Sequence, residues 1–226
     1  MSRTRIKICG LTREADVAAA VEAGADAVGF VFYPGSPRHV TPAQAARLAR
    51  EVPPFVSTVG LFVNADEATV LQTVSEVPLA LLQFHGDETP AQCLQVSRAA
   101  RLPFMRAARV RPGLDLVEFA KDYDAATALL LDAFVEGYGG GGHVFDWTLI
   151  PQPWLDPFHP SPAQRAAPRL VLSGGLNAQN VAGAIERVRP CAVDVSSGVE
   201  SSKGIKDHAR ITAFVQAVRA ADAALA

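Results

Sequence analysis

Residues 5–12 read Arg-Ile-Lys-Ile-Cys-Gly-Leu-Thr, a short apolar run that ends at a cysteine and a glycine. Such a run is typical of a buried strand, and the glycine that follows indicates a strand-to-helix turn. A second run, Ala128–Leu131, ends in the same way at a carboxylate, Asp132. The chain therefore places two proton-transfer groups, Cys9 and Asp132, at the carboxyl ends of two predicted strands. In a closed α/β barrel both would point into one mouth.

Apolar runs of this kind alternate with helical patterns along the whole chain. Several are almost unbroken, as expected for parallel strands buried on both faces. In the intervening stretches, apolar residues recur at i, i+3, i+4 and i+7, as they do between Val181 and Val188. The predicted strands are Arg5–Cys9, Ala27–Phe32, Ser57–Val63, Leu79–Phe84, Pro103–Val110, Thr127–Leu131, Arg169–Leu172 and Cys191–Val195.

Threonines mark the starts of three predicted helices. Thr12 follows the first strand, Thr41 precedes Pro42, and Thr89 precedes Pro90. A threonine hydroxyl accepts hydrogen bonds from first-turn amides, and proline fits the first helical position because its missing N–H is not needed there. We therefore expect each threonine to cap its helix.

Eight strand–helix units with right-handed crossovers fit a closed barrel or an open doubly wound sheet. An open sheet that binds dinucleotides should carry G-x-G-x-x-G after its first strand, and residues 9–13 do not. A length of 226 residues is ordinary for one barrel. We therefore predict an α/β fold over residues 1–226: a single (β/α)8 TIM barrel with a closed, parallel, eight-stranded sheet. Within it, residues 151–168 hold six prolines and predict an irregular surface excursion in place of a regular sixth helix.

Charge and composition exclude several classes of partner. The formal net charge of −2 gives no broad attraction for nucleic acid or for an anionic membrane. No apolar run approaches the roughly 20 residues needed to span a bilayer, and no apolar signal segment opens the chain. The three cysteines and five histidines show no metal-type spacing, so we predict no metal site. An odd number of cysteines also favours a reduced, cytoplasmic setting.

Two glycine-rich turns predict a phosphate site. Ser173-Gly174-Gly175 follows the seventh predicted strand, and Ser196-Ser197-Gly198 follows the eighth. Glycines let backbone amides approach an anion, and a helix amino terminus adds partial positive charge. Either turn alone is better explained as a tight strand-to-helix connection. The pair favours an anion, because the loops after strands seven and eight are the frequent phosphate site of barrels.

A further glycine run, Gly139–Gly142, has a different interpretation. Gly137 and Gly142 have the spacing of a nucleotide-binding P-loop, but His143 stands where that motif requires lysine. Nucleotide binding is therefore disfavoured. A mobile lid close to Asp132 and a simple flexible loop are both compatible with the glycines.

Cys9 is the candidate base among the three cysteines. Cysteine often acts as a small buried hydrophobe, which is our expectation for Cys93 and Cys191. Cys9 differs because it closes its strand at the predicted mouth, although a basic thiolate needs local positive charge. Lys7 shares its strand face but lies deep in the barrel. Asp132 is either the acid that partners Cys9 or the cap of the next turn.

Two further residues are candidates for binding a substrate. Arg38, on the loop after the second strand, either holds a carboxylate bidentately or lies solvated on the surface. His85 ends the fourth strand, faces the mouth and can orient substrate hydroxyls.

Together these motifs resemble the phosphoribosylanthranilate isomerase family of tryptophan synthesis. The matching blocks occur in family order along nearly the whole chain, and the first and last are the most specific. They are Lys7-Ile8-Cys9-Gly10-Leu11-Thr12, Gly29-Phe30-Val31-Phe32, Ser36-Pro37-Arg38, Val59-Gly60-Leu61-Phe62-Val63-Asn64, Gln83-Phe84-His85-Gly86, Leu131-Asp132-Ala133, Phe145-Asp146-Trp147, Ser173-Gly174-Gly175-Leu176 and Asp194-Val195-Ser196-Ser197-Gly198-Val199-Glu200.

The resemblance implies a barrel that is monomeric or homodimeric and has neither a metal nor an organic cofactor. It implies N-(5-phosphoribosyl)anthranilate as substrate and an Amadori rearrangement to 1-(2-carboxyphenylamino)-1-deoxyribulose 5-phosphate. Asp132 would be the general acid that opens the ribose ring, and Cys9 the general base that takes the C2 proton. Arg38 would hold the anthranilate carboxylate. The turns at residues 174–175 and 197–198 would hold the phosphate.

Two segments depart from the family pattern, and other sugar-phosphate barrels compete with this interpretation. Gly141 stands where the family usually has threonine or serine, with His143 after it, and residues 151–168 form a longer stretch than usual. A ribulose-phosphate epimerase would need metal-holding side chains, and an indole-glycerol-phosphate synthase a lysine at the mouth. A silent sugar-phosphate-binding barrel would not need Cys9 and Asp132. Isomerisation of the related aminosugar phosphate of histidine synthesis stays open, because the rearrangement is chemically the same.

Overall fold

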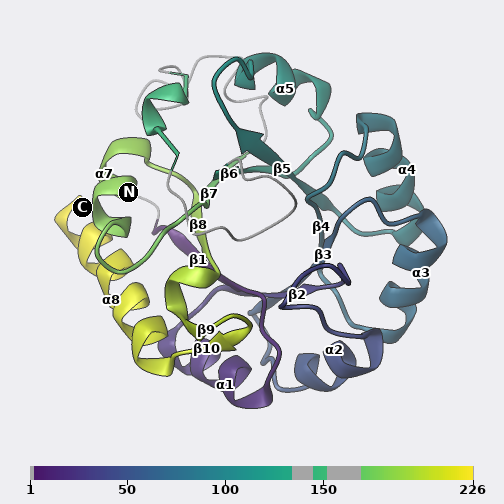
Figure 1. Ribbon diagram of the computed structural model, residues 1–226, viewed down its shortest axis with the longest axis horizontal. Helices are drawn as coiled ribbons and strands as arrows, with labels where there is room; N and C mark the ends of the chain where they lie inside the picture. The colour runs from purple at the N-terminus through teal and green to yellow at the C-terminus, as the bar shows by residue number, and fades with distance from the viewer. Residues whose placement is uncertain (1–2, 134–144, 152–168, 226) are drawn as a thin grey trace.

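A computed structural model describes residues 3–133, 145–151 and 169–225 of the chain. Its eight principal strands form a closed barrel in the order β1 to β8, and every neighbouring pair is parallel. Helices surround this barrel, as Figure 1 shows in a view down its axis. The predicted closed, parallel (β/α)8 barrel is confirmed. The strands are β1 (Arg5–Cys9), β2 (Ala27–Val31), β3 (Ser57–Phe62), β4 (Leu81–Phe84), β5 (Phe104–Val110), β6 (Ala128–Ala133), β7 (Arg169–Leu172) and β8 (Ala192–Val195).

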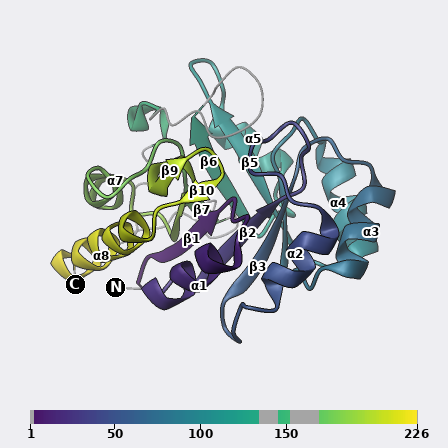
Figure 2. The same cartoon turned by 60° about the horizontal axis from the view of Figure 1, so that its bottom comes forward.

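The helices of the described residues follow the strands on the outside of the barrel, where Figure 2 shows them from the side. A short 3-10 helix, Trp147–Leu149, lies between β6 and β7. Neither the glycine run Gly139–Gly142 nor residues 152–168 of the proline-rich stretch belong to the described residues. The helices are α1 (Glu14–Ala23), α2 (Pro42–Ala49), α3 (Glu67–Glu76), α4 (Pro90–Ala100), α5 (Leu116–Asp122), α7 (Val181–Val188) and α8 (His208–Ala224).

The predicted strands agree with the observed ones to within about two residues at each end. The largest consequence concerns β6, which continues to Ala133 and so includes Asp132. Its partner β5 is long enough to pair with these last residues, because Arg109 lies opposite Asp132 and Val110 opposite Ala133. Asp132 is therefore held by strand pairing and not by a flexible loop.

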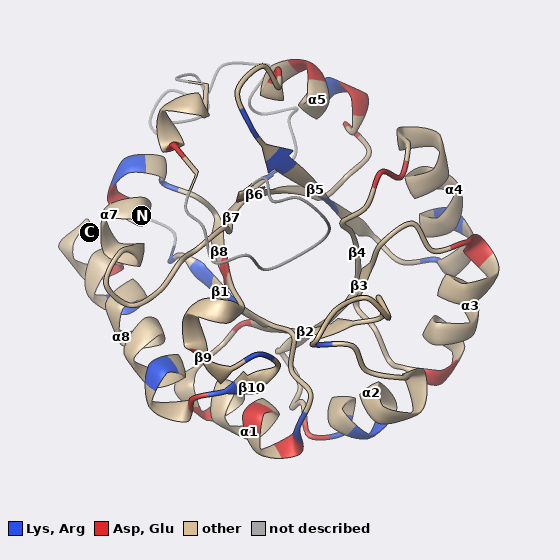
Figure 3. Cartoon of the chain, viewed as in Figure 1, with Lys and Arg blue, Asp and Glu red and all other residues tan. Residues whose placement is uncertain are grey.

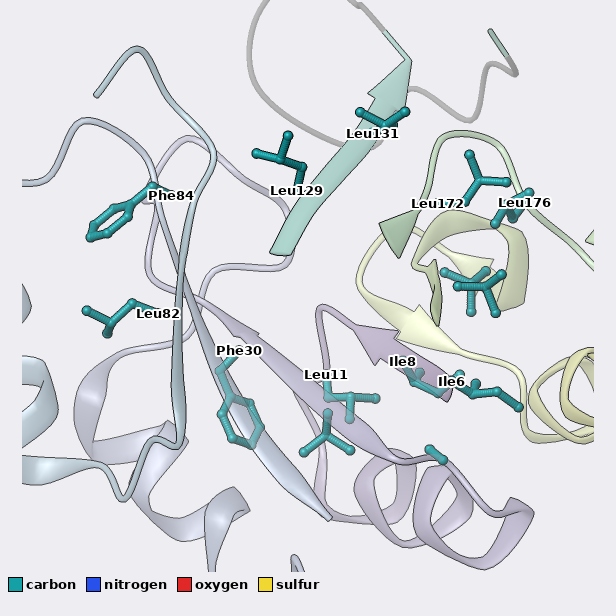
Figure 4. Close-up of a cluster of buried hydrophobic side chains, with 14 of the residues drawn as sticks. Ile6, Ile8, Leu11, Phe30, Leu82, Phe84, Leu129, Leu131, Leu172 and Leu176 are labelled. Atoms are coloured by element: carbon teal, nitrogen blue, oxygen red, sulfur yellow. The ribbon is translucent and has the colours of Figure 1, made fainter. Parts of the chain in front are cut away.

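Alternation along the strands divides the buried side chains into two layers. Outward-facing residues such as Ile6 and Phe30 pack against the helices, and Figure 4 shows this cluster. Each such side chain, fully buried, contributes about 1.5–3 kcal/mol to stability. A second, smaller cluster fills the inside of the barrel. Its buried members are Val59, Met105, Ala107, Leu130 and Val171.

Two of the three predicted threonine caps are confirmed. Thr41 and Thr89 each accept a hydrogen bond from the third helical residue and form a capping box with it. The prediction for Thr12 is wrong, because Arg13 is the residue that precedes α1 and its side chain makes no capping bond. The Thr12 hydroxyl instead donates to the carbonyl of Gly204, 2.7 Å away. Gly204 lies 192 positions further along the chain, so a tertiary contact takes the place of the expected local capping bond.

The segment between β8 and α8 contains a small antiparallel hairpin that the sequence pattern did not predict. Its strands are β9 (Glu200–Ser202) and β10 (Ile205–Lys206). Figure 1 shows the hairpin beside α1 and α8. It returns Glu200 and Lys206 to the interior, where both are buried. Among the described helices, none combines the length and the apolar character that crossing a membrane requires.

Candidate active site

The inward-facing residues at the carboxyl ends of the strands form the candidate site. Cys9 is the last residue of β1, Asp132 the penultimate residue of β6, and His85 follows β4 directly. Cys9 and His85 are buried, while the Asp132 side chain remains 16% exposed. Strand alternation turns all three side chains to the barrel interior, because each lies an even number of residues from inward neighbours on its strand. The structure thus brings the predicted acid, base and histidine to one end of the barrel.

His85 binds Asp132 directly. Its Nε2 lies 3.2 Å from Asp132 Oδ2, and its Nδ1 lies 3.0 Å from the Gln83 amide nitrogen. An amide N–H that donates to Nδ1 leaves the ring proton on Nε2, where it points at the carboxylate. The other carboxylate oxygen accepts from the Ala133 amide at 2.9 Å. Asp132 therefore has a donor on each oxygen, and sequence reasoning had not found the contribution of Gln83.

Charged residues surround Cys9 on one side. Figure 3 shows most charged residues on the outer helices and loops, so a charged pair inside the barrel is unusual. Lys7 and Asp194 form such a pair, with the Lys7 Nζ 2.8 Å from Asp194 Oδ1. Burial raises the pKa of the Cys9 thiol, while Lys7 and, to a smaller extent, Lys206 act to lower it. Lys7 is deep in the barrel, as expected, yet its charge acts on Cys9.

Arg38 lies close to Cys9 through the turn that follows β1. A β-carbon on Gly10 would stand 2.5 Å from the Arg38 Cδ, and Gly10 has a φ of 75°, which favours glycine. Arg38 is buried, so the alternative of a solvated surface arginine is wrong. Its Nε and Nη2 donate to the two oxygens of Glu200 at 2.6 and 2.9 Å. The guanidinium is therefore held in one orientation, and the stem of Arg38 packs against the residue that follows the candidate base.

Glu200 receives a second cation from the hairpin. The Lys206 Nζ donates to Glu200 Oε1 at 2.9 Å and to the Ser196 carbonyl at 3.0 Å. Burial alone would raise the pKa of Glu200, but Arg38 and Lys206 outweigh it and hold that pKa below its ordinary value. Burial lowers the pKa of Lys206, and Glu200 offsets part of that effect. Sequence reasoning had not assigned a role to Glu200 or Lys206.

The two glycine-rich turns lie against each other and against β6. Gly174 has a φ of 83° and Gly175 a φ of 62°, a backbone conformation that glycine adopts most easily. A β-carbon on Gly174 would stand 2.7 Å from the Ala133 amide nitrogen, and one on Gly198 would collide with the Leu176 carbonyl oxygen. A cavity of about 420 Å³ opens where the two turns meet α8. It is lined by Asn177, Ala178, Gln179, Ser197, Gly198, Arg210 and Ala213.

This arrangement can move protons on a small phosphorylated molecule. The described residues contain no cluster of three or more histidine, cysteine or acidic side chains that could hold a metal ion. Asp132 and Cys9 lie on strands that are separated by β7 and β8, the two strands that carry the glycine-rich turns. A phosphate held at those turns would leave the rest of a sugar free to reach both groups.

Comparisons with known proteins agree with this geometry. A family model described as N-(5'-phosphoribosyl)anthranilate (PRA) isomerase matches residues 6–217. The N-(5'-phosphoribosyl)anthranilate isomerase of Ralstonia nicotianae is 65% identical over 225 residues, covering 100% of this chain and 96% of that protein.

Solved structures give the same result. A phosphoribosyl anthranilate isomerase in complex with reduced 1-(o-carboxyphenylamino)-1-deoxyribulose 5-phosphate superposes with a TM-score of 0.80 at 42% identity, covering 96% of this chain and 99% of that one. Monomers of dimeric phosphoribosylanthranilate isomerase from Thermotoga maritima superpose with a TM-score of 0.79 at 40% identity, covering 96% and 98%. The match over nearly the full length, together with the barrel and its mouth, shows that the chain belongs to the N-(5'-phosphoribosyl)anthranilate isomerase family, which acts in tryptophan biosynthesis.

Proposed function

We propose that Cys9 and Asp132 carry the two proton transfers of the isomerisation. The reaction is an Amadori rearrangement that converts N-(5-phosphoribosyl)anthranilate to 1-(2-carboxyphenylamino)-1-deoxyribulose 5-phosphate. Asp132 gives a proton to the furanose ring oxygen, the C1–O bond breaks, and C1 forms a Schiff base with the anthranilate nitrogen. The Cys9 thiolate then removes the C2 proton, and the electron pair moves through C1 to the nitrogen. The resulting enolamine takes a proton at C1 and loses its 2-hydroxyl proton, which gives the ketone.

The surroundings of Asp132 suit a group that must become negative during the reaction. When a neutral Asp132 gives up its proton, the new carboxylate meets the His85 Nε2 proton and the Ala133 amide, which are already in place. Donors fixed where charge develops stabilise a transition state because they need no reorganisation. His85 therefore supports the acid in this proposal, in addition to contacting substrate hydroxyls.

Arg38 and the glycine turns are the proposed binding groups. A guanidinium has five N–H donors, and Glu200 takes two of those of Arg38. The remaining donors suit the planar carboxylate of the anthranilate ring. The turns at Gly174-Gly175 and Ser197-Gly198 would hold the phosphate through backbone amides.

One observation carries the proposal: an inward-facing thiol and an inward-facing carboxylate with two donors share one barrel mouth. The test is a fluorescence assay that follows consumption of phosphoribosylanthranilate by the purified protein, with the aminosugar phosphate of histidine synthesis assayed beside it. Turnover of the first substrate alone supports the assignment. Comparable turnover of both would add a second substrate to it.

The proposal extends to assembly as a homodimer through the amino-terminal end of the barrel. Phe55, in the loop before β3, is fully exposed and has a φ of 72°, a conformation that costs a non-glycine residue about 1–2 kcal/mol. A cavity of about 480 Å³ opens at the same end. Phe55 contributes to its wall, and most of the other lining residues are apolar, among them Ala27, Val59, Leu81, Met105, Ala128 and Val171.

A two-fold axis would let each Phe55 enter the cavity of the other copy, because projection and cavity lie on one face. The relative from Thermotoga maritima is described as dimeric, which supports a dimer of this chain. A cytoplasmic location completes the proposal, since Cys9, Cys93 and Cys191 are all free thiols.

A further inference from the structure

Lys7 and Asp194 form an ion pair in a part of the protein where stability does not require one. Lys7 lies two residues before Cys9 on the inward face of β1, and strand pairing sets it directly opposite Asp194 of β8. Their side chains are each only 6% exposed, and the Nζ–Oδ1 distance is 2.8 Å. Removing two charges from water costs roughly what their attraction returns, and apolar side chains often serve a core equally well. The pair therefore calls for a functional explanation.

The same end of the Lys7 side chain approaches the thiol. Strand pairing sets Gly29 opposite Cys9. A β-carbon on Gly29 would stand 2.9 Å from Cys9 Sγ and 3.2 Å from Lys7 Cε. The thiol and the end of the lysine therefore share the space beside a residue that has no side chain. The Lys7 ammonium is bound to Asp194, and its charge acts on the nearby thiol to lower the pKa of Cys9.

We propose that Cys9, Lys7 and Asp194 act as one unit, in which the Lys7 ammonium stabilises the Cys9 thiolate and Asp194 holds that ammonium in place. Lys7 and Asp194 are positioning residues here, and the inference rests on the proposed role of Cys9 as the base. Other activated nucleophiles and bases are built in the same way: one group activates the reactive atom, as Lys7 does here, and a third group orients the activating group, as Asp194 does.

Lys7 cannot itself take the substrate proton under ordinary conditions. Burial would lower its pKa, but Asp194 and Cys9 outweigh burial and raise that pKa above the value of an ordinary lysine. Lys7 therefore remains a cation while Cys9 gains and loses its proton. Burial raises the pKa of the Cys9 thiol more than any other influence, so a nearby fixed cation is what allows the thiolate to form.

The charged groups that face Cys9 come from three elements. Lys7 lies on its own strand, Asp194 on β8, and Lys206 on the hairpin. On the β2 side the strand partner is the uncharged Gly29, and Arg38 of the following loop packs against Gly10 with its guanidinium bound to Glu200. Lys206 contributes less than Lys7 to the Cys9 thiol, and its Nζ is held by Glu200 and the Ser196 carbonyl. Of the two lysines, Lys7 is therefore the one whose loss should raise the pKa of the Cys9 thiol more.

The test measures how readily the Cys9 thiol loses its proton in the absence of substrate. Alkylation of Cys9 by iodoacetamide, located by mass spectrometry, is followed against pH in the intact protein. We expect Lys7→Met to move the midpoint upward by at least about one pH unit, which corresponds to a tenfold change in thiolate. At neutral pH, kcat should fall about tenfold or more, with KM changed less than about threefold. Lys7→Arg, which keeps the charge, should recover part of both losses. Lys121→Met, at an exposed lysine of α5 paired with Glu118, is the matched control and should change neither.

A double variant separates function from folding. Lys7→Met leaves Asp194 as an unpaired buried charge, which by itself destabilises the protein. Lys7→Met with Asp194→Asn removes both charges and should regain thermal stability without regaining kcat. Its alkylation midpoint should return only part of the way, because the Asp194 charge by itself raises the pKa of the Cys9 thiol less than Lys7 lowers it. An unchanged midpoint in either variant, or full activity in the stable double variant, would overturn the proposal. If instead Cys9 is not the base, Cys9→Ala would keep its turnover, and this result distinguishes the two failures.

Discussion

Arg38 and Glu200 lie 162 positions apart in the chain and meet in a buried, bidentate ion pair. Glu200 begins the hairpin strand β9, whereas Arg38 lies on the loop after β2. Two parallel hydrogen bonds fix the plane of the guanidinium as well as its position. Gly10, directly after Cys9, leaves room for the stem of Arg38. The pair therefore holds a cation in a fixed orientation close to the turn that follows the candidate base.

The first prediction follows from that pair. Arg38→Met should raise KM for phosphoribosylanthranilate by about tenfold or more, because charge-assisted hydrogen bonds to a carboxylate contribute about 1.5–3 kcal/mol. Glu200→Gln keeps the shape but loosens the guanidinium, so its KM should be intermediate. Steady-state kinetics with an analogue that lacks the carboxylate provide the control. Equal losses for substrate and analogue would show that Arg38 does not bind that carboxylate.

The second prediction concerns the proton-transfer groups. Cys9→Ala and Asp132→Asn should each lower kcat by about 10²–10⁴-fold, the usual cost of losing a positioned acid or base. Asp132→Asn is nearly isosteric and Cys9→Ala removes a single sulfur atom, so circular dichroism and thermal unfolding should remain close to those of the unaltered protein. Cys93→Ala is the matched control, since Cys93 lies on α4 and burial raises its pKa to about 12. A variant at Cys9 or Asp132 that kept near-normal kcat would remove that residue from the mechanism.

The sequence predicted those features of the fold that depend on local pattern. Apolar runs located all eight strands, and Thr-Pro pairs located the starts of α2 and α4, because hydrophobic burial and capping act within a few residues. The positions of Cys9 and Asp132 at the mouth followed from the same argument. Ends of parallel strands meet at one edge of the sheet, so a residue at a strand end can be placed without knowing any contact.

Contacts between distant segments could not be predicted. The Arg38–Glu200 pair depends on the β9–β10 hairpin, whose two short strands leave no recognisable pattern in the sequence. Thr12 illustrates the same limit, because its expected capping role is lost to the Gly204 carbonyl of that hairpin. The Gln83–His85–Asp132 chain joins β4 to β6, and only the closed barrel shows that these strands face one another.

The third prediction concerns acid stability. Asp16 is fully buried and accepts hydrogen bonds from Arg13, His208 and the Lys206 amide. Burial would raise its pKa, but these donors outweigh it and hold the pKa of Asp16 below its ordinary value of 3.8. A lowered carboxyl pKa contributes stability above the ordinary pKa and loses it as the pH falls through the folded value.

Asp16→Asn should therefore destabilise the protein at neutral pH by about 1.5–3 kcal/mol, the contribution of hydrogen bonds to a charged group. The difference between the two proteins should shrink as the pH falls below 3.8. Thermal unfolding across that pH range measures it. A difference that stays constant with pH would indicate a packing defect instead of a lost charge.

The fourth prediction tests the assembly. Phe55→Ser should shift the protein from dimer to monomer in analytical ultracentrifugation, because it removes the projecting ring from both halves of the interface. Val117→Ser is the matched control, since Val117 is also exposed but lies on α5, away from the amino-terminal end. The unaltered protein sedimenting as a monomer at micromolar concentration would contradict the proposed dimer.

The last prediction concerns the phosphate end of the site. Substituting Gly174 would test little, because a side chain there presses on the Ala133 amide and on the Asp132 carboxylate as well. Ser197 is a better position, since it lines the cavity between the two glycine turns and lies beside Gly198.

Inorganic phosphate should inhibit competitively at millimolar concentrations, an affinity of about −4 kcal/mol. Ser197→Asp should remove that inhibition and raise KM at least about tenfold, because the new carboxylate would repel the phosphate at close range. Ser202→Asp introduces the same charge at an exposed position of β9 and should leave both quantities nearly unchanged. Phosphate inhibition that survives in Ser197→Asp would show that the phosphate binds elsewhere in the mouth.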